Sequence, residues 1–315
     1  MIKDKTQPTK VSPSTCISSQ EEQEGEAIER RTITLPSAFT DYTRSLFGDS
    51  LYQTFLKGLE DTPPVSIRLN PFKLAENTHK VNPQLHPQPI PWCKEGYWLE
   101  TRPNFTFDPL LHAGVYYVQE ASSMFLSHAL QYYVKQPVIA LDLCAAPGGK
   151  TAVLAEEMEN KGEIIAIDIH QHKKKLIEEN MKKLGIDIVK ATVLDARNVN
   201  KQGRKFDKIL VDVPCSGYGV IRKKPEILYT KNRENIEELA SLQLEILNSA
   251  ADILKDGGEL IYSTCTIISQ ENTENVEKFL NERKEFKVKA LNIPENVSGE
   301  YDKLGGFSIN YKEEI

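Results

Sequence analysis

From residue 138 onward, short apolar runs alternate with longer amphipathic segments, and this alternation limits the possible folds more than any other feature of the chain. Strand and helix in alternation are typical of a parallel sheet covered by helices on both faces. The sequence therefore predicts an α/β fold with a Rossmann-like sheet. The expected strands are 138–143, 163–169, 188–194, 208–213 and 259–263, and the expected helices lie near 150–160, 171–184, 234–255 and 270–283.

The part of the chain before this sheet has a different pattern. Residues 1–35 are polar and bury too little apolar surface to order themselves, so we expect a flexible tail. Residues 36–137 are expected to form a small α+β subdomain, and residues 138–315 the sheet domain. Within the subdomain the pattern predicts a helix over 36–62, a strand over 65–69, a proline-rich extended connector over 83–91 and a helix over 115–134.

Composition excludes several classes of protein. The longest apolar runs fall far short of the roughly 20 residues that a membrane span needs. No apolar secretory segment stands at the start, so we expect a cytoplasmic protein. Five widely spaced cysteines without a Cys-x-x-Cys pair argue against a disulfide scaffold and a metal site. The net charge of −6 gives no global basic field, and solvated surface is the competing explanation for the local lysine clusters.

The loop after the first expected strand has the features of a ligand site. Its small residues let a ligand approach the backbone, and the following helix offers free N–H groups to an anion. The loop fits neither a P-loop, which needs glycine at position 144, nor the dinucleotide pattern Gly-x-Gly-x-x-Gly. A generic tight turn is the competing explanation. The residues of this candidate cofactor loop are Cys144, Ala145, Ala146, Pro147, Gly148, Gly149 and Lys150.

Acidic residues follow the expected strands at corresponding positions. Asp142 lies just inside the first strand, Asp168 ends the second, and Asp195 and Asp212 follow the third and end the fourth. An acid at the position of Asp168 is suited to ribose hydroxyls. A nucleoside with an anionic end group, such as S-adenosylmethionine, fits a site of this kind. Helix capping is the competing role for any one of these acids.

Two cysteines follow neighbouring expected strands, Cys215 after the fourth and Cys265 after the fifth. Inert packing is the usual role of a buried cysteine, but two at one sheet edge favour chemistry. Carbon 5 of cytosine is a weak nucleophile, and addition of a thiolate at carbon 6 makes it enamine-like, so that it can attack a sulfonium methyl group. Such a reaction needs a thiol, an acid and a second proton-handling group, which Cys265, Asp212 and Cys215 supply. Spacing alone does not say which cysteine attacks.

Three segments resemble the Nop/Sun family of RNA cytosine-5 methyltransferases and occur in that family's order. They are Leu141-Asp-Leu-Cys-Ala-Ala-Pro-Gly-Gly-Lys-Thr151, Asp212-Val-Pro-Cys-Ser-Gly217 and Ser263-Thr-Cys-Thr266, and the likeness extends over about residues 36–310. The resemblance implies a class I S-adenosylmethionine-dependent methyltransferase sheet, bacterial 16S ribosomal RNA as the closest substrate class, and a monomer. The accessory RNA-binding modules of the family are not in this sequence, which affects expected substrate affinity more than chemistry.

The resemblance also implies a division of roles among the candidate residues. Cys265 would attack the base and Cys215 would help release the product. Lys150 and Asp212 would lie near the target base, Asp168 would bind the ribose, and Asp195 would lie at the adenine end.

Three residues after Cys215 are weaker candidates for contacts with RNA. Tyr218, Arg222 and Lys223 combine an aromatic ring with two cations, although a plain surface role is as good an explanation. The main alternative substrate is transfer RNA. Two other classes compete: a non-catalytic RNA-binding or assembly protein on the same fold, which the intact cysteines disfavour, and a dinucleotide-dependent dehydrogenase, which the glycine pattern disfavours.

Overall fold

The main sheet holds five parallel strands in the order β7-β6-β5-β8-β9. The computed structural model describes residues 35–74, 83–131, 137–293 and 295–309. Because every neighbouring pair is parallel, all five carboxyl ends lie at one edge of the sheet. The predicted α/β sheet is confirmed. Its strands are β5 (Val138–Leu143), β6 (Gly162–Asp168), β7 (Val189–Val193), β8 (Phe206–Asp212) and β9 (Leu254–Ser263).

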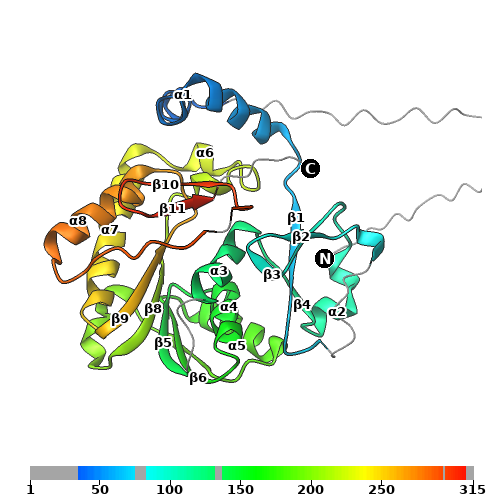
Figure 1. The fold of residues 1–315 in the computed structure, drawn as a ribbon, viewed down its shortest axis with the longest axis vertical. Coiled ribbons are helices and arrows are strands. Elements are labelled where there is room, and N and C mark those ends of the chain that lie inside the picture. The colour runs from blue at the N-terminus through cyan, green and yellow to red at the C-terminus, as the bar shows by residue number, and fades with distance from the viewer. Residues whose placement is uncertain (1–34, 75–82, 132–136, 294, 310–315) are drawn as a thin grey trace, which may run out of the picture. The chain divides into compact units, whose positions relative to one another are not determined.

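Helices cover both faces of this sheet, as Figure 1 shows. The pleat sends Ala140 into the core beneath α3, α4 and α5, and sends Leu141 into the core beneath α7. Phe279 of α8 packs beside α7. The covering helices are α3 (Phe125–Gln131), α4 (Gly149–Glu157), α5 (Gln171–Leu184), α7 (Arg233–Ala251) and α8 (Thr273–Glu282), with the short α6 (Ile227–Thr230) in the loop after β8.

The N-terminal part forms an antiparallel sheet in the order β2-β3-β1-β4. Its strands are β1 (Val65–Leu69), β2 (Gln88–Ile90), β3 (Cys93–Leu99) and β4 (Tyr116–Val118), and its helices are α1 (Ser37–Glu60) and α2 (Pro109–His112). A terminal hairpin of β10 (Gly299–Tyr301) and β11 (Phe307–Ile309) follows α8, and Phe307 packs against the core of the antiparallel sheet. Apart from Leu35, the predicted flexible tail over 1–35 lies outside the described residues.

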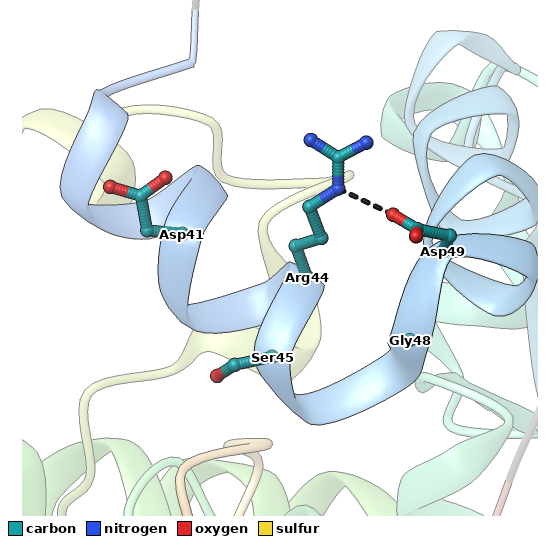
Figure 2. A pocket seen from close by; sticks show the side chains of 5 residues that line it. All are labelled: Asp41, Arg44, Ser45, Gly48 and Asp49. Carbon is teal, nitrogen blue, oxygen red and sulfur yellow. Dashed lines mark hydrogen bonds and ion pairs between the residues drawn. The ribbon is translucent and has the colours of Figure 1, made fainter.

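Helix α1 confirms the helix predicted over 36–62 but is bent at Gly48, whose φ of 67° and ψ of 168° are not helical. Glycine takes this positive φ without the clash that a side chain would cause. Figure 2 shows the hollow inside the bend, which Asp41, Ser45 and Gly48 line and an exposed ion pair between Arg44 and Asp49 crosses at 2.6 Å. Among the described residues, no helix combines the length and apolar character that a bilayer span requires.

Two local predictions were wrong. Residues 115–134 do not form one helix: the chain first pairs as β4 with β1, and α3 begins only at Phe125. The aromatic and β-branched residues of β4 favour a strand once a partner strand is present. Residues 83–91 are not only an extended connector, because β2 lies within them. Its proline, Pro89, is tolerated because β2 is an edge strand of the sheet.

A buried ion pair joins the antiparallel sheet to the parallel one. Arg68 of β1 is only 2% exposed; its guanidinium pairs with Glu156 of α4 and donates from Nε to Gln119 Oε1 at 2.8 Å. Burial lowers the pKa of Arg68. The pair is shielded from water, so each charge depends on the other for its stabilisation.

Removing one member of this pair should therefore destabilise the whole chain. We expect Arg68→Ala to lower the free energy of unfolding by about 3–5 kcal/mol, because Glu156 is left charged and buried. Urea unfolding followed by circular dichroism measures the loss. Arg44→Ala, which breaks an exposed pair, is the control and should unfold with the wild type. A loss below about 1 kcal/mol for Arg68→Ala, the size of a surface pair, would show that this joint does not hold the two sheets together.

Candidate active site

The candidate cofactor loop runs from the end of β5 into the first turn of α4. Gly148, with φ of 102°, is the residue before the helix, and no side chain caps the turn that follows. The first N–H groups of α4 therefore have no partner within the helix and can receive an anion. Space is limited at Gly149, where an added Cβ would lie 3.2 Å from the ring of Tyr117 and 3.5 Å from the amide nitrogen of Gln119. The predicted loop thus ends at an uncapped helix N-terminus, and the side chains of Tyr117 and Gln119 lie close to its backbone at Gly149.

The four acids are not equivalent in the structure. Asp142 is fully buried and accepts a 2.6 Å hydrogen bond from Thr151 of α4, and burial raises its pKa to about 7. It anchors α4 from below the loop. Asp168, also buried, ends β6 and accepts from the backbone N–H of His170 at 3.1 Å.

Asp195 caps the short turn after β7 and accepts from the guanidinium of Arg197 at 2.6 Å. The hydrogen bond from Arg197 lowers the pKa of Asp195. Asp195 therefore fills the capping role that competes with ligand binding. Asp168 also has partners, the N–H of His170 and, at 3.7 Å, the ammonium of Lys173, and its carboxylate lies at the sheet edge beside the loop.

Lys150, Asp212 and Ser263 form a polar cluster where β5, β8 and β9 end. Lys150 of α4 forms an ion pair with Asp212, and the hydroxyl of Ser263 donates to the same carboxylate at 2.7 Å. Asp212 and Ser263 are register partners in β8 and β9, which explains their contact. Sequence reasoning found Lys150 and Asp212 but missed Ser263, although the residue directly precedes the Thr-Cys segment.

The two cysteines meet beside this cluster. Their sulfur atoms lie 3.3 Å apart, and the backbone N–H of Cys265 also points to the Cys215 sulfur at 3.3 Å. The hydrogen bond from the Cys215 thiol lowers the pKa of Cys265 to about 7, with further help from the positive charges of Lys150 and Lys224, against opposing effects of burial and Asp212. The same bond and burial raise the pKa of Cys215. Cys265 is thus the thiol that ionises first.

The other cysteines in the described ranges have a different character. Burial raises the pKa of Cys93 to about 11 and that of Cys144 to about 12. These two are protonated near neutral pH and act as small packing residues. Lys224, which sequence reasoning missed, is a second positive charge near the thiols, beside Lys150. The basic cluster after Cys215 was the signal for it.

The structure gives internal partners to the three residues proposed for RNA contact. Tyr218 is buried, with its ring edge-on to Phe39 at 5.2 Å, which argues against stacking on a base. Arg222 donates to the backbone carbonyls of Asp61 and Thr62 after α1, at 3.3 and 2.8 Å. Lys223 forms an ion pair with Glu120. All three tie the loop after Cys215 to the N-terminal part of the chain.

An open helix end that can receive an anion, a buried acid on the next strand and a thiol of lowered pKa at the same sheet edge fit the class of S-adenosylmethionine-dependent methyltransferases. Sequence comparison agrees. The profile of the 16S rRNA methyltransferase RsmB/F family matches residues 131–306, and that of the N-terminal domain of 16S rRNA methyltransferase RsmF matches residues 35–121. The chain belongs to the RsmB/F family, whose cofactor is S-adenosylmethionine, and the predicted family resemblance is confirmed.

Individual relatives support this membership. Over 171 residues the chain is 46% identical to the probable ribosomal RNA small subunit methyltransferase B of Bacillus subtilis, covering 54% of this chain and 38% of the relative. Over 251 residues it is 36% identical to the ribosomal RNA small subunit methyltransferase F of Pectobacterium atrosepticum, covering 76% and 51%. The chain thus spans about half the length, or less, of these curated relatives.

A solved structure shares the fold. The crystal structure of a methyltransferase homolog protein from Pyrococcus horikoshii superimposes with a TM-score of 0.69 at 29% identity, covering 87% of each chain.

The thiol pair makes a pH-dependent prediction. Alkylation of Cys265 by iodoacetamide, followed by peptide mass spectrometry, should reach half its maximal rate near pH 7, because the reactive thiolate forms as pH rises through the lowered pKa. Cys215→Ala removes the hydrogen-bond donor and should move that midpoint upward, towards an ordinary thiol. The peptides with Cys93 and Cys144 serve as internal controls and should remain unmodified at pH 7. A midpoint that Cys215→Ala leaves unchanged would rule out the thiol–thiol hydrogen bond as the cause.

Proposed function

We propose that the protein methylates carbon 5 of a cytosine in RNA, with 16S-type ribosomal RNA as the substrate, through a covalent bond from Cys265 to carbon 6 of the base. The observation that carries the proposal is the thiol pair: Cys265 is exposed and has a lowered pKa, and its sulfur lies 3.3 Å from that of Cys215. An exposed, low-pKa thiol beside a carboxylate–ammonium pair is suited to covalent catalysis.

The cofactor site fits the methyl donor of the family. The open first turn of α4 would receive the carboxylate of S-adenosylmethionine, and Asp168 would hold its ribose hydroxyls. Asp195, although it pairs with Arg197, lies at the end of the next strand along and would border the adenine. When bound, S-adenosylmethionine would supply an electrophilic methyl group on its sulfonium sulfur, with the neutral thioether S-adenosylhomocysteine as the leaving group.

The first chemical step belongs to Cys265 and the Lys150–Asp212 pair. The Cys265 thiolate adds to carbon 6, the electron pair of the carbon 5–carbon 6 double bond forms a new double bond between carbon 4 and carbon 5, and the pair of the carbon 4–nitrogen 3 double bond moves to nitrogen 3. Carbon 5 thereby gains enamine character. This step puts negative charge on ring nitrogen 3, and the Lys150 ammonium, which Asp212 holds in an ion pair, would stabilise that charge; a proton passed from Lys150 through Asp212 to nitrogen 3 would neutralise it. Carbon 5 would then form its bond to the methyl carbon as the bond between that carbon and the sulfur of the donor breaks.

The last step restores the aromatic ring. A base removes the proton from carbon 5, the double bond re-forms, and the bond between carbon 6 and the Cys265 sulfur breaks to return the thiolate. The Cys215 sulfur lies 3.3 Å from that sulfur, and its raised pKa keeps it protonated while Cys265 is a thiolate. Once Cys265 is bonded to carbon 6, Cys215 can lose its proton to solvent, and its thiolate would then accept the proton from carbon 5. We assign product release to Cys215 for this reason.

The substrate assignment rests on relatives. Those that the chain matches are named for small-subunit ribosomal RNA, and residues 35–121 match the N-terminal domain of one of them. We therefore propose that residues 36–137 form a subdomain that contacts RNA, and that residues 138–315 form the catalytic domain. The target cytosine must leave its base stack to reach Cys265.

Two cysteine variants test the proposal. Cys215→Ala, mixed with 16S ribosomal RNA and S-adenosylmethionine, should accumulate a protein–RNA adduct that survives denaturing electrophoresis, because the attack proceeds and release fails. Cys265→Ala should form no adduct and transfer no methyl group. The wild type serves as the control, with adduct below that of Cys215→Ala and full turnover.

Other outcomes each have a definite meaning. An adduct with Cys265→Ala alone would make Cys215 the nucleophile and reverse the two roles. An adduct with transfer RNA but not with ribosomal RNA would change the substrate class. No adduct with any RNA, from variants that fold and bind S-adenosylmethionine, would contradict covalent catalysis and favour a non-catalytic RNA-binding protein.

A further inference from the structure

A buried carboxylate lies directly behind the loop that carries Cys215. Glu271, in the short turn Ser269–Glu271 that follows β9, is completely buried. Its Oε1 accepts from the backbone N–H of Ser216 at 2.8 Å, and its Oε2 accepts from the Ser216 hydroxyl at 2.5 Å. Ser216 is the residue after Cys215, so this carboxylate fixes one side of the cysteine.

Gln243 of α7 fixes the other side. Its amide nitrogen donates to the carbonyl of Pro214 at 2.9 Å and to Glu271 Oε1 at 2.8 Å. Its amide oxygen accepts from Asn275 at 3.1 Å and from the Tyr262 hydroxyl at 3.2 Å, so the orientation of the amide is determined by its partners. Cys215 therefore stands between two residues whose backbones are tied to one buried network.

The next residue, Asn272, lies between this turn and α8 and holds the loop that carries Cys265. Asn272 accepts from the hydroxyl of Thr264 at 2.5 Å and donates to the carbonyl of Thr266 at 2.9 Å. Thr264 and Thr266 flank Cys265. Two adjacent side chains thus hold the two cysteine loops. Glu271, together with Gln243, holds the residues on both sides of Cys215. Asn272 holds the residues on both sides of Cys265.

Two direct contacts also join the cysteine loops. The hydroxyls of Ser216 and Thr266 lie 2.7 Å apart, and the N–H of Gly219 donates to the carbonyl of Cys265 at 3.0 Å. A Cβ on Gly219 would lie 2.8 Å from that carbonyl oxygen, so the backbones are in contact without room for a side chain. With both loops anchored to one turn, the distance between the sulfur atoms depends on that turn.

We propose that Glu271 and Asn272 are positioning residues that hold the sulfur atoms of Cys215 and Cys265 at hydrogen-bonding distance. This role rests on the proposed function for its catalytic meaning, but the placement of the thiols is testable without RNA or cofactor. Each acts through a residue beside a cysteine: Glu271 binds Ser216, and Asn272 binds Thr264. The negative charge of Glu271 adds to the raised pKa of Cys215.

Four neighbouring groups act on the Cys265 thiol, so the pH midpoint of its alkylation reports a change in the position of any of them. They are Cys215 as hydrogen-bond donor, Asp212 as a negative charge, and Lys150 and Lys224 as positive charges. Asn272→Ala removes two hydrogen bonds beside Cys265 without leaving a buried charge. Glu271→Gln keeps the shape of the side chain but replaces one acceptor of the Ser216 hydroxyl with an amide. Glu274→Gln is the matched control, because Glu274 binds Ser269 in the same turn at 2.7 Å and neither cysteine loop.

The experiment measures the pH midpoint of Cys265 alkylation in each full-length variant, together with S-adenosylhomocysteine binding by calorimetry as a test of the fold. Asn272→Ala and Glu271→Gln should raise the midpoint above that of the wild type, because the donor thiol is no longer held at 3.3 Å. In a Cys215→Ala background Asn272→Ala should also slow adduct formation about tenfold, the scale of one or two lost hydrogen bonds, because Asn272 still holds the loop that carries Cys265. Affinity for S-adenosylhomocysteine should stay at the wild-type value, and Glu274→Gln should match the wild type throughout.

An unchanged midpoint and an unchanged adduct rate in Asn272→Ala would overturn the inference; this variant decides alone if Glu271→Gln fails to bind S-adenosylhomocysteine. An equal shift in Glu274→Gln would also overturn it, because general loosening of the turn would then be the cause. Failure of the proposed function would give a different result from failure of this inference. In that case Cys215→Ala forms no adduct at all, while the midpoints still separate the variants.

Discussion

The parallel pairing of β8 with β9 is the constraint on which the site depends. Asp212 and Ser263 are register partners at the ends of these strands, and the two cysteine loops begin within three residues of them. Because both strands run in the same direction, both loops leave the sheet at the same edge. β5 joins from the other side of β8 and delivers Lys150 through α4 to the same carboxylate. One sheet edge therefore brings together groups that are more than a hundred residues apart in the chain.

Charge at this edge is arranged so that one thiol, and only one of the pair, ionises easily. A second thiolate 3.3 Å from the first would be strongly disfavoured by repulsion, so the two sulfur atoms keep one proton between them. The positive charges of Lys150 and Lys224 favour the thiolate on Cys265 and leave that proton on Cys215. Lys150 serves both sides of this arrangement: it neutralises Asp212, which would otherwise repel the thiolate, and it attracts the thiolate itself. Removal of the Cys215 thiol, of Asp212 or of Lys150 would therefore change the pKa of Cys265 without any change at Cys265 itself.

The sequence was enough to predict the parallel sheet, the cofactor loop and the two cysteines at one edge, because these follow from local periodicity and from the direction of parallel strands. It was not enough for contacts between distant segments. Residues 115–118 read as helix until β1 is present as a partner. The sequence also predicted contacts with RNA for Tyr218, Arg222 and Lys223. In the structure these side chains contact, in the same order, the ring of Phe39, the backbone after α1 and the carboxylate of Glu120. The burial of Glu271 could not be predicted from its neighbours in the sequence, because an acidic residue just before a helix is usually exposed to solvent.

The central claim is that Cys265, held against the thiol of Cys215, is the group that attacks the base. The most direct measurement uses wild-type protein, S-adenosylmethionine and RNA that contains 5-fluorocytidine, whose carbon 5 carries no removable proton and therefore traps the covalent intermediate. Nuclease and protease digestion followed by mass spectrometry then locates the modified nucleotide on a peptide. The account predicts a methylated fluorocytidine on the peptide that contains Cys265. The same adduct on the peptide that contains Cys215 would contradict it.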